Sequence, residues 1–534
     1  MKKIAIVSLL SLAAASALAQ TSYDALQMSD NEYFGTARTL AMGNAFTALG
    51  GDPGSFGINP AGSAVNRYAQ FTITPNLSIA ATGAGYSADP LGTAFGPDYQ
   101  GKRSRITLPN YGVSAYMNLG RRRGLKGISI GFVGNATANY LDRVSAAGTN
   151  PHTSFMAEMA DGLSYDGVPY TTFSPNPAAN YDNTNLSWRE ALGWNTGMFY
   201  HPDGTDDANY LGTSEVDAFV LGGPLNQRWG RETSGYKHDM VLNFGMNFSD
   251  RFFLGFNLGM VGLEMKKDAY LMEEAVNPAD FPNNFDGTQT YFKMARLRDQ
   301  LTVDGSGVYG KIGFIYVPTP LLRFGAAIQT PTVMNVHEYF QTAGSLEFSD
   351  SRFSASDKTP RGEGEYRIIS PYRVNAGAAV NFGLGVISAD YEMTDYGTMR
   401  FRSVYNDPLA YDYFYENEDI VNTYGIVHAL RLGFEVKPAP ELALRAGYNV
   451  STVPEIVHDA DNRVRQSASV GLGYSSGGSF YCDLALRGLF RAKEYYQLYN
   501  NYMYDDEGRL VHASPTVRID SSLFDIAMTF GWRF

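Results

Sequence analysis

One stretch of the sequence, residues 524–534, carries the pattern that most constrains the fold. Every even-numbered residue in it is large and apolar, and every odd-numbered residue is small, polar or charged. A period of two is typical of a strand with one apolar face. A tilted strand needs about 9–11 residues to cross a bilayer, whereas strands of soluble proteins usually have about 5–6. The stretch therefore predicts a membrane-spanning strand.

The same alternation recurs along the chain. Leu430, Leu432 and Phe434, for example, alternate with Arg431 and Gly433. About fourteen segments show it, an even number, as closed bacterial barrels require. Because lipid can cover the apolar faces of so many long strands, we expect an all-β fold, a 14-stranded antiparallel transmembrane β-barrel. The expected strands lie near 68–80, 108–119, 126–140, 236–248, 251–265, 302–317, 321–337, 364–382, 385–396, 426–437, 441–450, 466–474, 478–491 and 522–534.

Short and long connections alternate between these segments without exception. Tight turns such as 249–250 and 438–440 are typical of the periplasmic side of an outer-membrane barrel, and long loops are typical of the outside. The same order places residue 534 on the periplasmic side. The expected outer loops are 81–107, 141–235, 266–301, 338–363, 397–425, 451–465 and 492–521.

The first residues read as an export signal. Lys2 and Lys3 precede an apolar stretch over 4–18, and Ala17 and Ala19 fit a small-residue cleavage site. We expect a signal peptide over 1–19, and hence an exported multi-pass barrel in the outer membrane of a Gram-negative bacterium. The formal net charge of −12 argues against a nucleic-acid partner, and the single Cys482 excludes an internal disulfide.

Residues 20–66 precede the barrel, which we assign to 67–534. They are rich in small and apolar residues, nearly neutral, and without the charge of a solvated tail, so we expect them to be packed inside the protein. A barrel of fourteen strands is too wide to be filled by its own side chains. We therefore predict that this segment, called the plug below, lies inside the barrel, with a short helix over 37–49 ended by the glycine-rich run 50–54.

Part of the plug resembles a known motif. It contains Ala41-Met42-Gly43-Asn44-Ala45, then Asp52, then Asn59-Pro60-Ala61-Gly62, directly before the first strand. This order resembles the hatch of the FadL/TodX family of outer-membrane transport proteins, and the glycine- and tyrosine-rich style is similar to Bacteroidetes members that are sometimes labelled hemin receptors. The resemblance implies a barrel with a hatch. It also implies passive uptake of a hydrophobic molecule, such as a long-chain fatty acid, a similar lipid or an aromatic hydrocarbon.

The resemblance also implies a route. The ligand binds an apolar groove among the outer loops, enters a pocket above the hatch and leaves sideways at a kink of the third strand after the hatch moves. Gly134 and Asn135 interrupt that strand and are our candidates for the kink, although an ordinary strand glycine explains the pattern equally well. Arg323 or Arg373 could anchor a ligand carboxylate, but a ladder of ion pairs lining a wet lumen is the favoured interpretation of the inward arginines.

Enzyme signatures are weak in this chain. The run Gly127-Ile128-Ser129-Ile130-Gly131 matches a nucleophile motif but lies within a predicted strand instead of a strand–turn–helix. The seven histidines show no metal-binding spacing. We therefore expect no catalytic residues, no metal and no cofactor.

Three functions remain open. A transporter of hydrophobic molecules predicts an apolar pocket between the plug and the loops. A haem receptor would need an axial His or Tyr in an outer cavity, and a structural or secretion-associated barrel predicts a polar interior. Phe534, with Trp532 and Phe530, fits the signal that the barrel-assembly machinery reads. We expect that machinery and outer-membrane lipids as partners, and a protein that is otherwise a monomer.

Overall fold

The computed structural model describes residues 21–534, apart from 90–93, 203–207, 218–219, 286, 406–410, 457–462 and 505–508. The expected signal peptide over 1–19 lies outside the described residues. Over the described ranges, no helix is both long and apolar enough to span a membrane.

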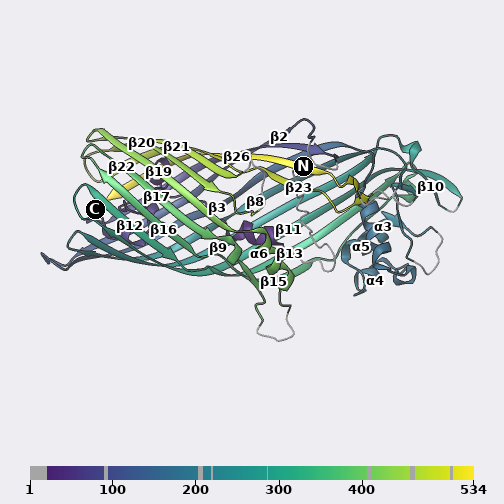
Figure 1. The fold of residues 1–534 in the computed structure, drawn as a ribbon, viewed down its shortest axis with the longest axis horizontal. Coiled ribbons are helices and arrows are strands. Elements are labelled where there is room, and N and C mark those ends of the chain that lie inside the picture. Colours follow the sequence, from purple (N-terminus) through teal and green to yellow (C-terminus); the bar gives the residue numbers. More distant parts are fainter. Residues whose placement is uncertain are drawn as a thin grey trace.

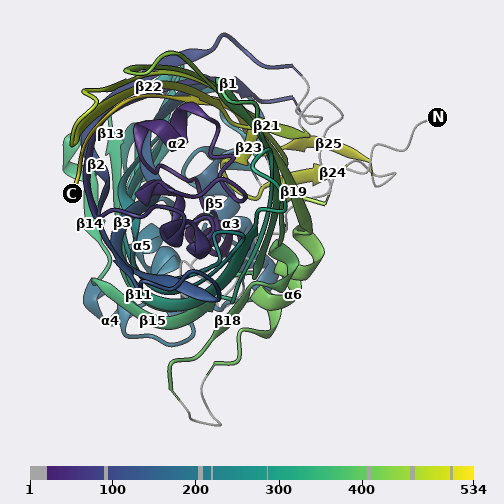
Figure 2. The ribbon, with the colours of Figure 1, turned by 90° about the vertical axis from the view of Figure 1, so that its left-hand side faces the viewer.

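Antiparallel strands form a closed barrel (Figures 1 and 2). Each wall strand pairs with the next along the chain, and the first pairs with the last, so that Gln70 lies opposite Arg533. The predicted 14-stranded barrel is confirmed. Its wall consists of β1 (Gln70–Ser87), β2 (Tyr99–Asn118), β3 (Leu125–Asn150), β8 (Leu225–Phe248), β9 (Phe252–Ala275), β11 (Thr288–Tyr316), β12 (Leu322–Gln329) with β13 (Val333–Phe348), β15 (Gly362–Ile369) with β16 (Arg373–Asn381), β17 (Gly385–Asp395), β19 (Ile426–Ala439), β20 (Leu442–Thr452), β21 (Val464–Ser475), β22 (Phe480–Phe490) and β26 (Thr516–Arg533).

Two wall strands are each divided in two by a proline. Pro331 separates β12 from β13, and Pro371 separates β15 from β16. Both halves of each strand still pair with the same neighbours, because β11 pairs with β12 and β13, and these pair with β16 and β15. Proline has no N–H to donate to a ladder, which explains why the interruptions lie at these two positions.

The two faces of the wall have opposite character. Outward side chains such as Leu242, Leu258 and Leu432 are 50%, 53% and 43% exposed. Inward polar side chains such as Asn243 and Glu435 are buried. This is the reverse of a soluble protein, and it fits a barrel whose outer face lies in hydrocarbon. The protein is thus an outer-membrane barrel, as the alternation predicts.

The wall is much taller on one side than on the other. β3, β8, β9 and β11 have 26, 24, 24 and 29 residues, whereas β17, β20 and β22 have 11 each. The tall strands therefore continue into ranges that the sequence predicts as loops, such as 266–275 and 288–301. Outward residues turn polar there, as with Glu264, Lys266 and Asp268, so the alternation that identified the strands ends before the strands do.

Connections at the tall end form a cap (Figure 1, right). Phe155, Met156, Leu192 and Phe199 are fully buried in it and belong to one cluster with Trp229 of the wall. The cap and outer connections contain helices α3 (Phe155–Asp166), α4 (Pro177–Tyr181), α5 (Trp188–Thr196) and α6 (Phe414–Thr423), the 3₁₀ helices η3 (Tyr170–Thr172), η4 (Pro278–Asp280), η5 (Ser351–Phe353) and η6 (Tyr396–Thr398), and the short strands β4 (Phe199–Tyr200), β5 (Leu211–Gly212), β6 (Glu215–Asp217), β7 (Val220–Leu221), β10 (Pro282–Phe285), β14 (Ala355–Lys358), β18 (Arg400–Arg402), β23 (Glu494–Gln497), β24 (Tyr502–Tyr504) and β25 (Leu510–Ala513).

Candidate transport pathway

The described part of the plug, residues 21–66, lies inside the ring of strands (Figure 2). It contains α1 (Ser22–Ser29), α2 (Ala37–Ala41), η1 (Pro53–Ser55) and η2 (Pro60–Ala64). The helix expected over 37–49 is too long, because α2 ends at Ala41. Gly43 and Asn44 follow with φ of 60° each, a left-handed conformation that a helix cannot continue through.

Asn59 joins the plug to the wall. Its Oδ1 accepts a hydrogen bond from the Ala61 N–H at 3.1 Å and so caps η2, whose first residue is Pro60. Its Nδ2 donates to the Thr47 carbonyl oxygen at 2.7 Å and to the Phe314 carbonyl oxygen of β11 at 3.0 Å. The side chain is fully buried, so these bonds are made without competition from water.

The other motif residues fix the shape of the plug. Asp52 caps η1 by accepting from the Gly54 N–H at 2.9 Å, and it also accepts from the Thr36 hydroxyl at 2.7 Å. Asn44 Nδ2 donates to the Tyr33 carbonyl oxygen at 2.9 Å. The Gly62 carbonyl oxygen accepts from the Gly51 N–H at 2.8 Å. Apart from Asn59, these bonds are internal to the plug.

Glycines of the wall let the plug backbone come very close. A Cβ added to Gly447 would lie 2.0 Å from the Gly43 nitrogen. One added to Gly255 would lie 2.2 Å from the Pro60 carbonyl carbon, and one added to Gly325 would lie 2.1 Å from the Thr47 carbonyl oxygen. Sequence reasoning missed this cradle, although its signal was visible as glycine at inward positions of predicted strands.

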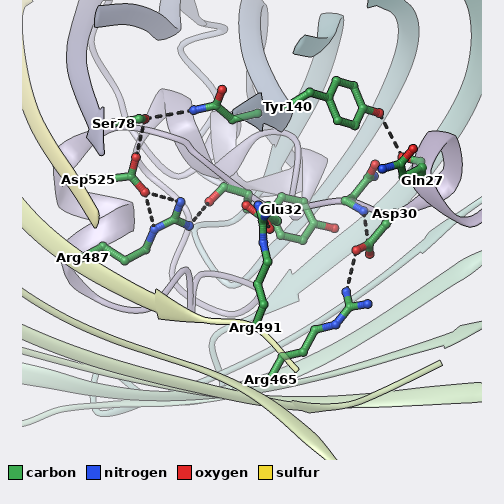
Figure 3. Close-up of polar contacts among 12 residues, drawn as sticks. Gln27, Asp30, Glu32, Ser78, Tyr140, Arg465, Arg487, Arg491 and Asp525 are labelled. Carbon is green, nitrogen blue, oxygen red and sulfur yellow. Dashed lines mark hydrogen bonds and ion pairs between the residues drawn. The ribbon is translucent and has the colours of Figure 1, made fainter. Parts of the chain in front are cut away.

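A small cavity of about 90 Å³ lies above the lower plug (residues 37–66, as distinct from the upper plug, residues 21–36) and beside the shorter strands of the wall. Five arginines and three carboxylates contribute to its lining. Figure 3 shows Arg465, Arg487 and Arg491 of this set together with Asp30 and Glu32. The cavity is therefore charged, whereas the transporter hypothesis predicts an apolar pocket. These charged residues are Arg373, Arg431, Arg465, Arg487, Arg491, Asp30, Glu32 and Glu392.

Most of these charges are paired. Arg465 lies 2.6 Å from Asp30, and Arg491 lies 3.1 Å from Glu32, so two wall arginines hold the upper plug. Arg487 makes two hydrogen bonds to Asp525, at 2.6 and 3.0 Å, and donates a third to the Tyr33 carbonyl oxygen at 3.3 Å. These contacts form the ladder of ion pairs that the inward arginines suggest.

Arg431 is the exception among these arginines. Its Nη2 lies 3.0 Å from Glu392, but Nε and Nη1 have no hydrogen-bond partner among the described residues. The side chain is only 4% exposed, so water cannot freely satisfy these donors. Buried unpaired donors are costly, and an anionic group in the cavity would satisfy them.

The two candidate anchors lie at different heights. Arg323 Nη1 donates to the Leu49 carbonyl oxygen at 2.9 Å, in the lower plug, and does not line the cavity. Arg373 does line it, with Nη2 donating to the Ser29 carbonyl oxygen at 2.8 Å. Of the two, the structure places only Arg373 beside Arg431 and Glu392.

The ladder between β2 and β3 stops partway up the barrel. Its last pair is Asn110–Asn135, and above it β2 pairs only with β1 while β3 pairs only with β8. Gly134 and Asn135 lie at this point, and the β3–β8 register shifts just above it, between Ala136 and Ala138. We call the stretch above Asn135, where β2 and β3 are not paired, the seam.

Two prolines explain part of this break. The β1–β2 register shifts where Pro75 faces Leu108 and Pro109, at the lower end of the seam. Prolines in facing strands remove two ladder donors and distort the pairing locally. The Tyr111 ring covers Gly134, where an added Cβ would lie 2.3 Å from it. The prolines were a signal for the break that the sequence reasoning did not use.

Residues 127–131 lie inside β3, as expected. Ser129 Oγ is 2.8 Å from the Ser63 hydroxyl of the plug, so the residue belongs to the plug–wall contact. Over the described ranges, no group of three or more His, Cys, Asp or Glu side chains is arranged to hold a metal ion.

Comparisons with known proteins find no matching family model and no matching curated protein. Among solved structures, the chain is similar to the Pseudomonas putida toluene transporter TodX, with 15% identity, 95% of this chain and 99% of that chain covered, and a TM-score of 0.49. A Pseudomonas aeruginosa FadL homologue has 12% identity, coverage of 94% and 99%, and a TM-score of 0.49. The Ralstonia pickettii toluene transporter TbuX has 13% identity, coverage of 93% and 98%, and a TM-score of 0.45. FadL and TodX are also the names of the family that the Asn59–Pro60 motif resembles.

Proposed function

We propose that the protein is an outer-membrane channel of the FadL/TodX type for passive uptake of hydrophobic molecules. The ligand enters from the outside, rests above the lower plug and leaves sideways through the seam. An amphiphile with an anionic head, such as a long-chain fatty acid, fits the charged cavity better than a plain hydrocarbon does.

The observation that carries the proposal is the coincidence of a filled lumen with a break in the wall. The lower plug closes the straight path through the barrel, while the β2–β3 ladder ends at Asn110–Asn135. The outward residues of β2 at the lower end of the seam are apolar, with Ile106 79% and Leu108 45% exposed. A hydrophobic ligand leaving here moves directly into lipid, where each buried CH₂ contributes about 0.8 kcal/mol, so no energy source is needed.

Arg431 supports an anionic head group for the ligand. Its free Nε and Nη1 would donate to a carboxylate, with Arg373 nearby on the same cavity. Guanidinium groups prefer such planar, two-oxygen acceptors. The hydrocarbon tail would then extend away from this charged lining toward the seam.

Binding is tested with oleate as the probe. Native mass spectrometry of the gently solubilised protein is expected to show bound oleate, and also any lipid retained from the membrane. Arg431→Gln should weaken oleate binding by about tenfold to a hundredfold, because it removes a hydrogen-bonded charge pair worth about 1.5–3 kcal/mol. The matched control is Arg323→Gln, which removes an arginine outside the cavity and should leave binding unchanged. Equal binding by the wild type and Arg431→Gln would contradict the assignment of the head group.

Transport is tested in a Gram-negative host that lacks its own long-chain fatty-acid channel. The protein is expected to restore uptake of labelled oleate, while a variant without residues 20–60 should admit polar solutes as well. If the wild type restores no uptake of oleate or of toluene, the proposed function is wrong.

A polar interior also favours a second function, a structural or secretion-associated barrel. The charged cavity is what that hypothesis predicts. It further predicts a stoichiometric partner chain that remains with the barrel in mild detergent and protects the outer connections from protease. Purification of the barrel alone, together with oleate uptake, would exclude it.

A further inference from the structure

Side chains replace the backbone ladder along the seam. Below it, nine consecutive residue pairs from Asn118–Gly127 to Asn110–Asn135 join β2 to β3. Above it, residues 99–107 of β2 remain paired with β1. The Thr82 hydroxyl of β1 donates to the Arg143 carbonyl oxygen of β3 at 2.5 Å. The upper β1–β2 pair is thus a flap that rests on β3 without being part of its ladder.

Two arginines of this flap reach past β3 to β8. Arg105 Nη2 donates to the Gly235 carbonyl oxygen at 2.6 Å and to Asn139 Oδ1 of β3 at 2.5 Å. Arg103 Nη1 donates to the Thr233 carbonyl oxygen at 3.1 Å. Arg103 Nη2 lies 3.1 Å from Glu232. All of these contacts cross the seam, and each depends on a guanidinium group.

The acceptor side is built to receive them. Gly235 has a φ of 134°, a conformation that residues with a side chain rarely adopt, and an added Cβ would lie 2.0 Å from the Glu264 carbonyl oxygen. Gly101, two residues from Arg103, lies so close to β3 that an added Cβ would be 2.2 Å from the Arg143 carbonyl oxygen. Gly101 therefore lets the flap lie close to β3, while Gly235 lets β8 lie close to β9 in the conformation that presents its carbonyl oxygen to Arg105.

The two faces of β2 in the flap differ. Arg103 and Arg105 point toward β3 and β8, whereas Ile106 and Leu108 on the other face are 79% and 45% exposed. Moving the upper part of β2 away from β3 would break side-chain bonds but no pair of the β1–β2 or β3–β8 ladders, while β1 stays paired with β26 at its other edge. Individual side-chain hydrogen bonds are modest in strength, so this movement costs less than separating two fully paired strands.

We infer that Arg103 and Arg105 form a latch that holds the seam closed, and that the seam opens when the upper part of β2 swings away from β3 and β8. The inference rests on the proposed lateral exit for its role in transport. The existence of the latch can be tested without any ligand.

The test measures the distance across the seam. Spin labels are placed at Ser104→Cys on the flap and Tyr236→Cys on β8, both exposed positions, in a Cys482→Ser background. Double electron–electron resonance in lipid nanodiscs is expected to show mainly the short distance between the two labels that corresponds to the closed seam. In Arg103→Gln/Arg105→Gln, the longer, open distance should gain about tenfold in population relative to the closed one, because hydrogen bonds to charged groups are lost.

Lys102→Gln is the matched control. It removes one positive charge from the same strand and leaves the bonds of Arg103 and Arg105 in place, so its distances should equal those of the wild type. Closed barrels are verified by their heat-modifiable migration on gels. If the double variant does not fold, Arg105→Gln alone and Arg105→Lys carry the test, with the lysine variant expected to be intermediate. Unchanged distances in folded arginine variants would overturn the latch.

The same variants separate the latch from the proposed function. A wider seam with faster oleate uptake supports both. A wider seam with unchanged uptake supports the latch and counts against the lateral exit. Unchanged distances with altered uptake reject the latch and leave the exit route intact.

Discussion

The lower and upper halves of the plug are held in different ways. In the lower half, residues 37–66, backbone atoms lie directly against wall glycines such as Gly255, Gly325 and Gly447. In the upper half, residues 21–36, charged side chains make many of the contacts, beside apolar packing of α1 against the wall. Asp24, Asp30 and Glu32 lie 3.2, 2.6 and 3.1 Å from wall cations. Arg38, which pairs with Glu435 at 2.9 Å, marks the boundary between the two halves.

This difference indicates which half can move. Close backbone packing has one good geometry and resists sliding, since a displacement of a few tenths of an ångström already produces overlap or voids. Ion pairs on long side chains exchange partners over a wider range of positions. We therefore expect a ligand to displace the upper half while the lower half stays seated.

Removing the plug tests the comparison most severely. Deletion of residues 20–60 should leave a barrel that folds, because the wall strands pair with one another and not through the plug. Without the plug the wide lumen is unfilled, so single-channel conductance in planar bilayers should rise at least about tenfold. Conductance equal to that of the full chain would show that the segment does not close the lumen.

A side chain in the glycine cradle should unseat the lower half. Gly447→Val places atoms where the Gly43 nitrogen already lies, and such overpacking costs about 3 kcal/mol. Thermal unfolding in detergent should show the loss, with partial opening in conductance traces. Gly262→Val is the control, since the nearest atom to an added Cβ there is 4.0 Å away. Equal losses of thermal stability in the two variants would mean that the close contact between Gly447 and the plug does not hold the lower half.

Asn59→Ala should have a somewhat smaller effect on the same half. It removes the cap of η2 and leaves the Thr47 and Phe314 carbonyl oxygens without their donor, at a cost of about 2 kcal/mol. Asn31→Ala, in the upper half, is the comparison variant and should be nearly neutral. Chemical denaturation of both purified variants measures the difference. If Asn59→Ala left the free energy of unfolding unchanged, Asn59 would not contribute to holding the plug in place.

Arg465→Gln should have the smallest effect, and only on the upper half. The side chains of Arg465 and Asp30 are each about a quarter exposed. The expected loss in the free energy of unfolding is therefore about 1 kcal/mol or less, and it should shrink in high salt. Hydrogen exchange is the sensitive measurement. We expect faster exchange over residues 21–36 and an unchanged exchange rate over residues 37–66. Equal acceleration in both halves would contradict the division of the plug.

The sequence predicts the barrel well and its height badly. Alternation identifies the lipid-facing part of each strand, as at Leu430 and Leu432, because lipid imposes a strict preference on every second residue. Above the lipid that preference ends, so the upper parts of β9 and β11 look like loops. Their pairing is supported by contacts such as the ion pair of Arg298 with Asp268, two residues that only the folded sheet brings together.

The site was predictable in its location more than in its chemistry. Motif residues of the plug and the position of Gly134 and Asn135 could be read locally. The charge of the cavity could not, because it is assembled from Asp30 of the plug and from Arg431 and Arg465 of separate strands. Likewise, nothing local to Arg105 reveals that its partner is Gly235, 130 residues away.

The contacts of α2 have a consequence for biogenesis. The Ala37 N–H donates to the Thr529 hydroxyl, a residue 492 positions further along the chain, and Arg38 pairs with Glu435. The plug, near the start of the chain, therefore finds these partners only when the final strands are present. Until then it has no core of its own to bury, and it must wait in an unfolded state in the periplasm. Closure of the barrel and docking of the plug are therefore a single late event.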